Sequence, residues 1–314
     1  MDHSQVKGLL FPEEINPFAK GTSERSTIQT QFCGSIGLLD NLKFTCKNNH
    51  NTHNPICFDA PAGIPNLKNS CYLSSALQCL LNFKALMEYI LNIPNHIRQQ
   101  VDFLNIFALF IVAYQKKKSA DILLYTRLIK NALGKENDEF NGTKQCDMSE
   151  CLEVILDILE REVQELRVKN LLTGPNLIHD LFTFKIGSKP RCTDCEAFQF
   201  LWEPSRTFPC EIEFGQDEEV SLLKCVRETI LLFNKNCPKC LGNPIGMEQW
   251  ETIPSVFMFQ LNRVKFENKK ETKIRRKVKI PKTFTIGLHT FALSSISSHL
   301  GVNTSTGHYV TDAR

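Results

Sequence analysis

One stretch decides how the chain is organised: Gly63-Ile-Pro-Asn-Leu-Lys-Asn-Ser-Cys-Tyr-Leu-Ser-Ser-Ala-Leu-Gln-Cys-Leu-Leu81. Its first half holds a Gly, a Pro and two Asn, which is typical of a turn. Its second half has leucines at helical spacing and Ser70 as a possible N-cap, which predicts a helix. Cys71 would then lie in the first helical turn, where the helix dipole and unpaired backbone N–H groups favour a thiolate. Cys71 is therefore a candidate nucleophile; the alternative is a small buried hydrophobic residue.

The composition describes a globular protein without a strongly charged surface. The 314 residues include 37 Lys and Arg and 34 Asp and Glu, with a net charge of +3, which indicates no polyanionic partner. The N-terminus lacks the basic start and apolar run of a signal peptide. The longest apolar run, 103–113, is too short to span a bilayer. We expect a soluble intracellular protein of the cytoplasm or nucleus, with no membrane or nucleic-acid partner.

The chain contains 13 cysteines. In a large intracellular protein, an odd number of cysteines favours reduced thiols, metal ligands or catalysis over a disulfide framework. Residues 1–60 are polar and irregular, and we expect an N-terminal extension docked on the main domain. The His and Cys residues of this segment have spacings that match no common zinc pattern: Cys33, Cys46, His50, His53 and Cys57.

The remaining chain changes from helical to strand-like character. Apolar spacing predicts helices from Cys71 to about Leu91, then over 100–115, 119–134 and about 147–164. From about residue 181, β-rich runs separated by turn residues predict strands. These runs are 181–186, 197–201, 256–261, 291–299 and 306–310, with strand and helix signals over 220–233. We therefore expect a helical subdomain followed by a β-rich one.

Two CxxC pairs lie in the β-rich half, Cys192–Cys195 and Cys237–Cys240. A CxxC turn directs two thiolates to one ion, and two such turns complete a closed tetrahedral site. The pattern predicts a structural Zn²⁺ without an open position for catalysis. The alternatives are a redox CxxC, which would not need two copies, or coincidence.

A nucleophilic cysteine needs a base, and His308 in Gly307-His-Tyr is the candidate. Gly307 would let this strand approach another backbone closely. Asn66, just before Cys71 across the turn, is the candidate oxyanion donor through its side-chain amide. Alone, His308 would more often be an ordinary strand histidine.

Five motifs, taken in order, resemble those of the ubiquitin-specific proteases. They are Asn66-Leu-Lys-Asn-Ser-Cys-Tyr72 with the helix after it, Gln145-Cys-Asp-Met-Ser-Glu150, the two CxxC pairs, Leu261-Asn-Arg263, and His299-Leu-Gly301 with Gly307-His-Tyr309. The family's cysteine box reads approximately GLxNxGNTCYxNSxLQxL and its histidine box HxG…GHYxAY. The resemblance covers residues 63–314, and the order and spacing of the motifs make it specific.

The resemblance implies an α+β, papain-like cysteine protease fold with a helical thumb, a β-rich palm and zinc-ribbon fingers. The catalytic domain would span 61–314, with the thumb at about 63–180, the fingers at about 185–250 and the palm in the remainder. The cleft between thumb and palm would receive the extended C-terminus of ubiquitin, and the fingers would grip its body. Ubiquitin and ubiquitinated proteins are the partners that this resemblance implies.

The resemblance also implies roles for single residues. Cys71 would be the nucleophile, His308 its base and later acid, and Asn66 the oxyanion donor. Asp147 would contact the substrate tail, which carries arginines, although it could equally cap the following helix. The implied reaction is acyl transfer: Cys71 attacks the carbonyl of the terminal glycine of ubiquitin, His308 protonates the leaving lysine amine, and water hydrolyses the thioester.

The chain departs from the family pattern in three places. Lys68 stands where the family has Gly, so its Cβ could strain the turn that aims Asn66. Ser70 and Ser74 are mild replacements of Thr and Asn. The third catalytic residue of the family, an Asp or Asn, lies well beyond GHY. Asp312 would lie about 13 Å from His308 along the strand, so we expect a C-terminally shortened member.

Three functions follow as hypotheses. The first is a thiol-dependent deubiquitinase that hydrolyses bonds after the C-terminal glycine of ubiquitin, because a Cys–His pair retains some activity without its orienting partner. The second is a weak or inactive ubiquitin-binding pseudoprotease. The third is a zinc-ribbon nucleic-acid binder that uses the basic run 273–279. The low net charge disfavours this third function, and a solvated hairpin is the ordinary interpretation of such a run.

Overall fold

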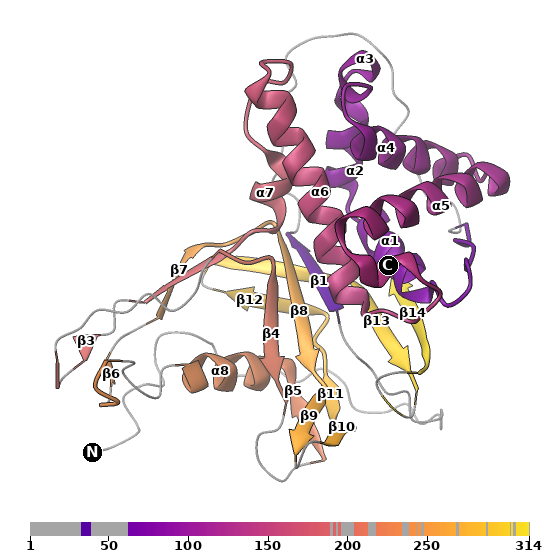
Figure 1. The fold of residues 1–314 in the computed structure, drawn as a ribbon. Coiled ribbons are helices and arrows are strands. Elements are labelled where there is room, and N and C mark those ends of the chain that lie inside the picture. Colours follow the sequence, from indigo (N-terminus) through magenta and orange to yellow (C-terminus); the bar gives the residue numbers. More distant parts are fainter. Residues whose placement is uncertain are drawn as a thin grey trace.

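The structure is a computed structural model, and it describes residues 33–38, 62–188, 191–192, 194–195, 204–212, 218–233, 239–242, 244–245, 248–267, 270–286, 288–301, 303 and 306–313. Its helical region, residues 71–182, lies on one side of a central sheet (Figure 1). The helices are α1 (Cys71–Leu81), α2 (Lys84–Asn92), α3 (Asn95–Arg98), α4 (Asp102–Gln115), α5 (Ser119–Glu136), the 3₁₀ helix η2 (Asp138–Asn141), α6 (Met148–Val168) and α7 (Leu177–Phe182). The predicted helices over 100–115, 119–134 and 147–164 are confirmed with small changes of their ends.

The first helix is shorter than predicted. It ends at Leu81, and a separate helix begins at Lys84. The side-chain amide of Asn82 donates hydrogen bonds to the carbonyl oxygen and the hydroxyl of Ser294, at 2.8 and 2.6 Å. This contact with a distant strand fixes the break, so the prediction of one helix to about Leu91 is wrong because tertiary contacts override the local periodicity.

The central sheet has six strands within the described residues, in the order β12–β13–β1–β8–β4, with β14 paired to β13. Their bounds are β1 (Cys33–Leu38), β4 (Thr207–Glu211), β8 (Val256–Asn262), β12 (Thr283–Ile286), β13 (His289–Leu300) and β14 (His308–Ala313). All neighbours are antiparallel except β4 and β8, which are parallel. Strand β1 comes from the segment expected as an extension and lies between β13 and β8. The predicted strands 256–261, 291–299 and 306–310 are confirmed, the last two as neighbours.

Smaller strand pairs extend from this sheet. They are β2 (Lys185–Ser188) with β7 (Glu248–Thr252), β3 (Arg191–Cys192) with β6 (Pro244–Ile245), β9 (Val264–Glu267) with β10 (Lys270–Lys273), and β5 (Glu219–Ser221) with β11 (Lys277–Lys279). Figure 1 shows β2 and β7 reaching away from the sheet as an arm, with β3 and β6 toward its tip. The predicted strand 181–186 is only half right, because Leu181 and Phe182 end α7. The predicted strand 197–201 lies outside the described residues.

The central strand β8 separates two hydrophobic cores. Val256 and Met258 belong to the core of the helical region. Phe257, Phe259 and Leu261 belong to a second core, which helix α8 (Leu222–Phe233) covers on the opposite face of the sheet. Successive side chains of β8 point to opposite faces of the sheet, so helices pack on both faces. Gln260 lies on the same side of the strand as Met258, toward the helical region, where the candidate site is built.

Candidate functional site

The turn before α1 positions the side chain of Asn66. Its Oδ1 accepts hydrogen bonds from the backbone N–H and the hydroxyl of Ser70, at 2.9 and 3.2 Å. The Ser70 hydroxyl in turn accepts the N–H of Leu67 at 2.7 Å. Because a backbone N–H can only donate, the Asn66 oxygen is the acceptor and its NH₂ group remains available to a ligand. This orientation is the one that an oxyanion donor requires.

The same turn contains two residues in the left-handed region. Lys68 has a φ of 63° and Asn69 a φ of 49°. The predicted need for a permissive residue at position 68 is confirmed, since a side chain with a Cβ costs about 1 kcal/mol there. Asn69 tolerates this region better, and its amide donates to the carbonyl oxygen of Thr143 at 2.9 Å. The turn is therefore tied to the segment before α6.

Cys71 is the first residue of α1, as predicted, with Ser70 at the N-cap position. It is a free thiol and only 4% exposed. The Ser70 side chain makes no capping hydrogen bond, because it is bound to Asn66. The first intrahelical bond joins Ser74 N–H to Ser70 O, which leaves the N–H groups at the helix start without a helical partner. A negative charge on the sulfur or on an adjacent acyl oxygen would be stabilised here.

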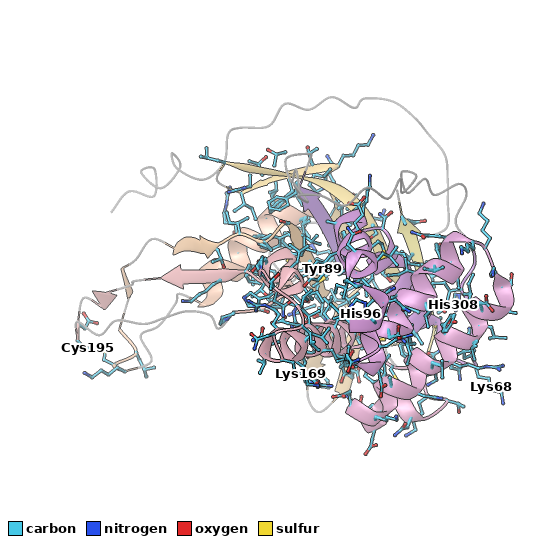
Figure 2. The ribbon with its side chains drawn as sticks, turned by 90° about the horizontal axis from the view of Figure 1, so that it is seen from above. Lys68, Tyr89, His96, Lys169, Cys195 and His308 are labelled. Atoms are coloured by element: carbon cyan, nitrogen blue, oxygen red, sulfur yellow. The ribbon has the colours of Figure 1, made fainter. Side chains whose placement is uncertain are left out.

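Helix α1 lies along β14, so the Cys71 end of the helix lies at the start of that strand. The Thr311 hydroxyl donates to the Ser75 carbonyl oxygen at 3.3 Å. Tyr309 lies within electrostatic range of Cys71. His308 opens β14 and is exposed. The fold thus brings Cys71 and His308 to one end of the sheet, while no hydrogen bond between their side chains is present among the described residues. Figure 2 shows Lys68 and His308 on the helical side of the molecule, opposite Cys195 at the tip of the arm.

Gln145 holds the backbone just before His308, which the motif alone did not reveal. Its Oε1 accepts the N–H of Gly307 at 2.8 Å, and its Nε2 donates to the carbonyl oxygen of Gly307. The predicted close approach at Gly307 is confirmed, since a Cβ there would lie 2.5 Å from the Leu300 carbonyl oxygen. This pair of hydrogen bonds fixes the position of the strand that carries His308.

Asp147 caps helix α6 and also binds the His308 strand. Its Oδ1 accepts the N–H groups of Ser149 and Glu150 at 2.8 and 3.2 Å. Its Oδ2 accepts the hydroxyl of Tyr309 at 3.2 Å. Burial, with the Asp147 charge beside it, raises the pKa of Tyr309. Of the two roles that the sequence left open, the cap is present, and the contact with a substrate tail remains a prediction.

A cavity of about 500 Å³ lies between α6 and the strands β4 and β8. Three carboxylates line it, those of Asp147, Glu150 and Glu153, together with Thr207 and Gln260 from the strands. Burial raises the pKa of Glu150, and the charges of Glu139 and Asp147 act in the same direction. Such a concave acidic site favours a cationic or hydrogen-bond-donating ligand.

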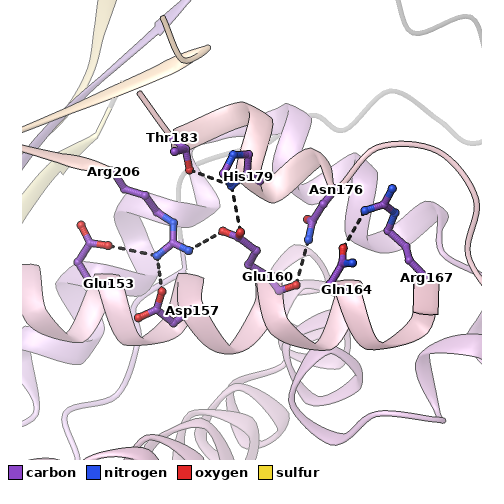
Figure 3. Close-up of polar contacts among 9 residues, drawn as sticks. All are labelled: Glu153, Asp157, Glu160, Gln164, Arg167, Asn176, His179, Thr183 and Arg206. Atoms are coloured by element: carbon purple, nitrogen blue, oxygen red, sulfur yellow. Dashed lines mark hydrogen bonds and ion pairs between the residues drawn. The ribbon is translucent and has the colours of Figure 1, made fainter. Parts of the chain in front are cut away.

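Arg206 joins α6 to the start of β4 at the end of this cavity (Figure 3). Its guanidinium donates to Asp157 and Glu160 at 2.5 Å each and to Glu153 at 3.3 Å. The hydroxyl of Thr207 donates to the other oxygen of Glu153. Paired carboxylates on one helix face thus hold the strand against the helix and fix the cavity wall at Glu153.

The predicted zinc site lies partly outside the described residues, because Cys237 is not among them. The pairing of β3 with β6 places the Cys192–Cys195 turn beside the segment that follows Cys240. A Cβ on Gly242 would lie 1.9 Å from Asp194 Oδ2 and 3.2 Å from Cys240 Sγ. The two turns are therefore neighbours, which fits a shared ion, although the described residues alone contain no group of three metal-ligating side chains. Of the N-terminal Cys and His residues, only Cys33 falls within a described segment.

The basic run 273–279 is not simply a solvated hairpin. Lys277 and Lys279 are exposed. In contrast, the Lys273 ammonium donates to His299, and the Arg276 guanidinium donates to the Ile212 carbonyl oxygen at 3.1 Å. The interpretation as a solvated face is therefore wrong for these two residues, because their side chains cap backbone carbonyls inside the fold.

Within the described segments, no helix combines the length and apolar character needed to cross a membrane.

Comparison of sequences relates the chain to one protein family. The sequence profile described as "Ubiquitin carboxyl-terminal hydrolase" matches residues 62–314. Ubiquitin carboxyl-terminal hydrolase 2 of Homo sapiens is 24% identical over 304 residues, which cover 81% of this chain and 49% of that protein. Ubiquitin carboxyl-terminal hydrolase 26 of Arabidopsis thaliana is 26% identical over 270 residues, which cover 80% of this chain and 24% of that protein. The chain thus spans about half or less of the length of these two relatives.

Comparison of structures agrees in fold. The structure described as "SAGA Ubp8/Sgf11/Sus1/Sgf73 DUB module bound to ubiquitin aldehyde" matches with a TM-score of 0.64 and 18% identity, over 82% of this chain and 64% of that one. A second structure, of the yeast module with a mutant Sgf73, matches with a TM-score of 0.61 and 16% identity, over 82% of this chain and 63% of that one. The α+β fold is therefore shared with a deubiquitinating module. Since the profile covers residues 62–314, which are most of the chain, the chain belongs to the ubiquitin carboxyl-terminal hydrolase family.

Proposed function

We propose that the chain is a thiol-dependent deubiquitinase that hydrolyses the bond after the C-terminal glycine of ubiquitin. The observation that supports this most is the juxtaposition of the Cys71 end of α1 with the start of β14, where His308 lies. Family membership supplies the substrate class. Ubiquitin and ubiquitinated proteins are accordingly the proposed partners.

In the proposed reaction, the Cys71 sulfur attacks the carbonyl carbon of the terminal glycine, and His308 holds the proton of the thiol. The Asn66 NH₂ group donates to the developing oxyanion, because its oxygen is already bound to Ser70. His308 then gives the proton to the leaving amine, and a thioester to Cys71 remains. Water attacks this thioester with His308 as base and releases the ubiquitin carboxylate.

The acidic cavity is the proposed site for the arginine-bearing tail of ubiquitin. Asp147, Glu150 and Glu153 line it on the α6 side, within the described part of the chain. A guanidinium pairs well with carboxylates in such a partly enclosed site. Each carboxylate already accepts at least one hydrogen bond within the chain, Asp147 from Tyr309, Glu150 from Asn137 and Glu153 from Arg206, so a guanidinium would bind to their remaining lone pairs.

We also propose that the arm carries a structural Zn²⁺ held by Cys192, Cys195, Cys237 and Cys240. The ion would pin together the two turns that β3 and β6 bring side by side. Metal analysis of the purified chain should give one zinc per molecule, and Cys240→Ser should remove it. The same content in Cys240→Ser and in the unsubstituted chain would refute this assignment.

A ubiquitin with a C-terminal electrophile tests the catalytic proposal. We expect a covalent adduct with the unsubstituted chain and with Cys79→Ala, and none with Cys71→Ala. Cys79 is a matched control because it lies on the same helix, and burial raises the pKa of its thiol to about 11, which makes it a poor nucleophile. An adduct that persists in Cys71→Ala would exclude Cys71 as the nucleophile.

The second candidate is a ubiquitin-binding protein without turnover. It is favoured by the exposed His308 ring, which has no hydrogen bond among the described residues to orient it. Binding of ubiquitin by the unsubstituted chain without any adduct would support this candidate. Absence of both binding and adduct would contradict both candidates.

A further inference from the structure

His299 is a buried histidine beneath the loop that leads to His308. It is 2% exposed and pairs with Tyr309 across β13 and β14, with ring centroids 4.8 Å apart. A Cβ on Gly307 would lie 2.4 Å from its Nε2, and a Cβ on Gly301 would lie 3.0 Å from its Cε1. The imidazole therefore packs directly against the backbone at both ends of the loop 301–307.

Lys273 fixes the orientation of this ring. Its ammonium lies 2.9 Å from Nδ1 of His299 and donates to the carbonyl oxygens of His299 and Gly301 at 3.2 and 3.1 Å. An ammonium has three protons to donate and no lone pair. Nδ1 of His299 must therefore accept, which requires a neutral imidazole with its proton on Nε2.

Gly307 is consequently held from two sides. The Gln145 side chain binds both its N–H and its carbonyl oxygen. The ring of His299 lies against its Cα on the other side, too close for any side chain. His308 is the next residue, so the position of its backbone depends on both contacts.

We propose that His299 is a positioning residue for His308 and that Lys273 keeps it in the neutral Nε2–H form. The proposal rests on the proposed function only for its kinetic readout. His299 itself is not the base, because it is buried and its Nδ1 lone pair is bound to Lys273.

The charges around His299 agree with a neutral ring. Burial lowers the pKa of His299; the Lys273 ammonium on β10 adds to this, Asp147 at the start of α6 opposes it, and His308 on β14 adds again. Burial, with the charges of Arg263 and Arg275, also lowers the pKa of Lys273.

Acid should therefore lower the contribution of His299 to the free energy of unfolding. An unfolded histidine gains its proton as the pH falls through about 6.5. Folded His299 resists that protonation, since its pKa is lowered. Its contribution to stability is thus complete above about pH 6.5 and is lost as the pH falls through the folded pKa.

Nitrogen-15 NMR of the histidine rings tests the assignment without any substrate. We expect His299, identified by comparison with the His299→Asn spectrum, to show a protonated Nε2 and an unprotonated Nδ1 at neutral pH. In Lys273→Met, the His299 signal should titrate at higher pH, and the His308 signals should shift. Lys279→Met is the matched control, because it removes an exposed lysine of the same basic run and should change neither signal.

Kinetics with a ubiquitin C-terminal amide supply the second readout. Lys273→Met should lower kcat by about 10- to 100-fold and leave KM within about 2-fold, since His308 and not the tail cavity is displaced. A charged or Nδ1-protonated His299 at neutral pH would overturn the proposal. The proposal would also be overturned if Lys273→Met were less stable than the unsubstituted chain but had unchanged His308 signals and an unchanged kcat. If the unsubstituted chain hydrolyses no ubiquitin amide, the proposed function fails, and the NMR result alone decides the role of His299.

Discussion

The two sides of the candidate site are held in different ways. On the nucleophile side, Asn66 and Ser70 are four residues apart, and their contacts lie within one turn. On the histidine side, Gly307 is held by Gln145, 162 residues away in the sequence, and by His299, which Lys273 fixes across 26 residues. The orientation of Asn66 is thus set locally, with one further contact from Asn69 to Thr143, whereas the histidine side depends on the assembled fold. Removing a polar group on the nucleophile side should change chemistry with little change in stability, and substitutions on the histidine side should change chemistry and stability together.

The largest effect is expected at Asn66. Asn66→Asp keeps an oxygen to accept the Ser70 N–H but loses the NH₂ donor, so kcat should fall about 100- to 1000-fold with little change in the melting temperature. Asn69→Asp adds the same charge to the same turn and loses a different donor, the one to the Thr143 carbonyl oxygen; it should lower kcat less than about 10-fold. Equal losses in the two variants would show that the charge, and not the lost donor, is responsible.

The second largest effect is expected for Gly307→Ala, on the histidine side. Its Cβ would lie 2.4 Å from His299 Nε2 and 2.5 Å from Leu300 O, so the strand must move. We expect about 100-fold lower kcat/KM, together with a lower melting temperature. Gly63→Ala is the control, because nothing lies within 4 Å of its Cβ. A fully active and stable Gly307→Ala would mean that the histidine side is not set by this packing.

A smaller effect is expected for Gln145→Ala. The variant loses both hydrogen bonds to Gly307 and should be destabilised by about 2 kcal/mol, with kcat about 10-fold lower. Denaturant unfolding and steady-state kinetics measure the two quantities. Asn141→Ala removes a contact with Asp138 and one with Gly134, neither of which involves Gly307, and should leave kcat unchanged. If Gln145→Ala lowers kcat without lowering stability, the histidine side does not depend on the assembled fold in the way described above.

The smallest effect concerns Lys68. Lys68→Gly should relieve the left-handed backbone and raise the free energy of unfolding by about 0.5 kcal/mol, with a small gain in kcat if the turn aims Asn66 better. Lys117→Gly, at a φ of 52° outside the site, should give a similar gain in stability and none in kcat. An identical change of kcat in both variants would remove the link between this strain and catalysis.

The same division explains what the sequence could predict. Asn66, Cys71 and the helix start follow from residue types within a few positions, so the local pattern was sufficient. Gly307 was recognisable because a glycine before the strand implies a close backbone approach. Periodicity does not predict the break at Asn82, since the break depends on a hydrogen bond to Ser294, which is distant in the sequence. The basic run 273–279 predicts a solvated charge at Lys273, because composition does not reveal that its ammonium faces inward.

Strand β1 is the element that the local sequence predicts least well. Its sequence, Cys33-Gly-Ser-Ile-Gly-Leu38, has two glycines and little alternation, and glycine weakens an isolated strand. It is a strand because β8 and β13 both pair with it. Such a segment obtains its conformation from its neighbours, so propensity alone could not identify it.

The position of β1 also has a consequence for how the protein is made. Its partners, 256–260 and 291–297, follow it by more than two hundred residues. The ribosome therefore releases the middle strand well before the two strands that flank it, and the sheet cannot close until the chain has emerged through β13. Pairings of such high sequence separation form slowly. If β1 is removed, β8 and β13 present two unpaired edges to each other and to other chains, and unpaired edges favour aggregation.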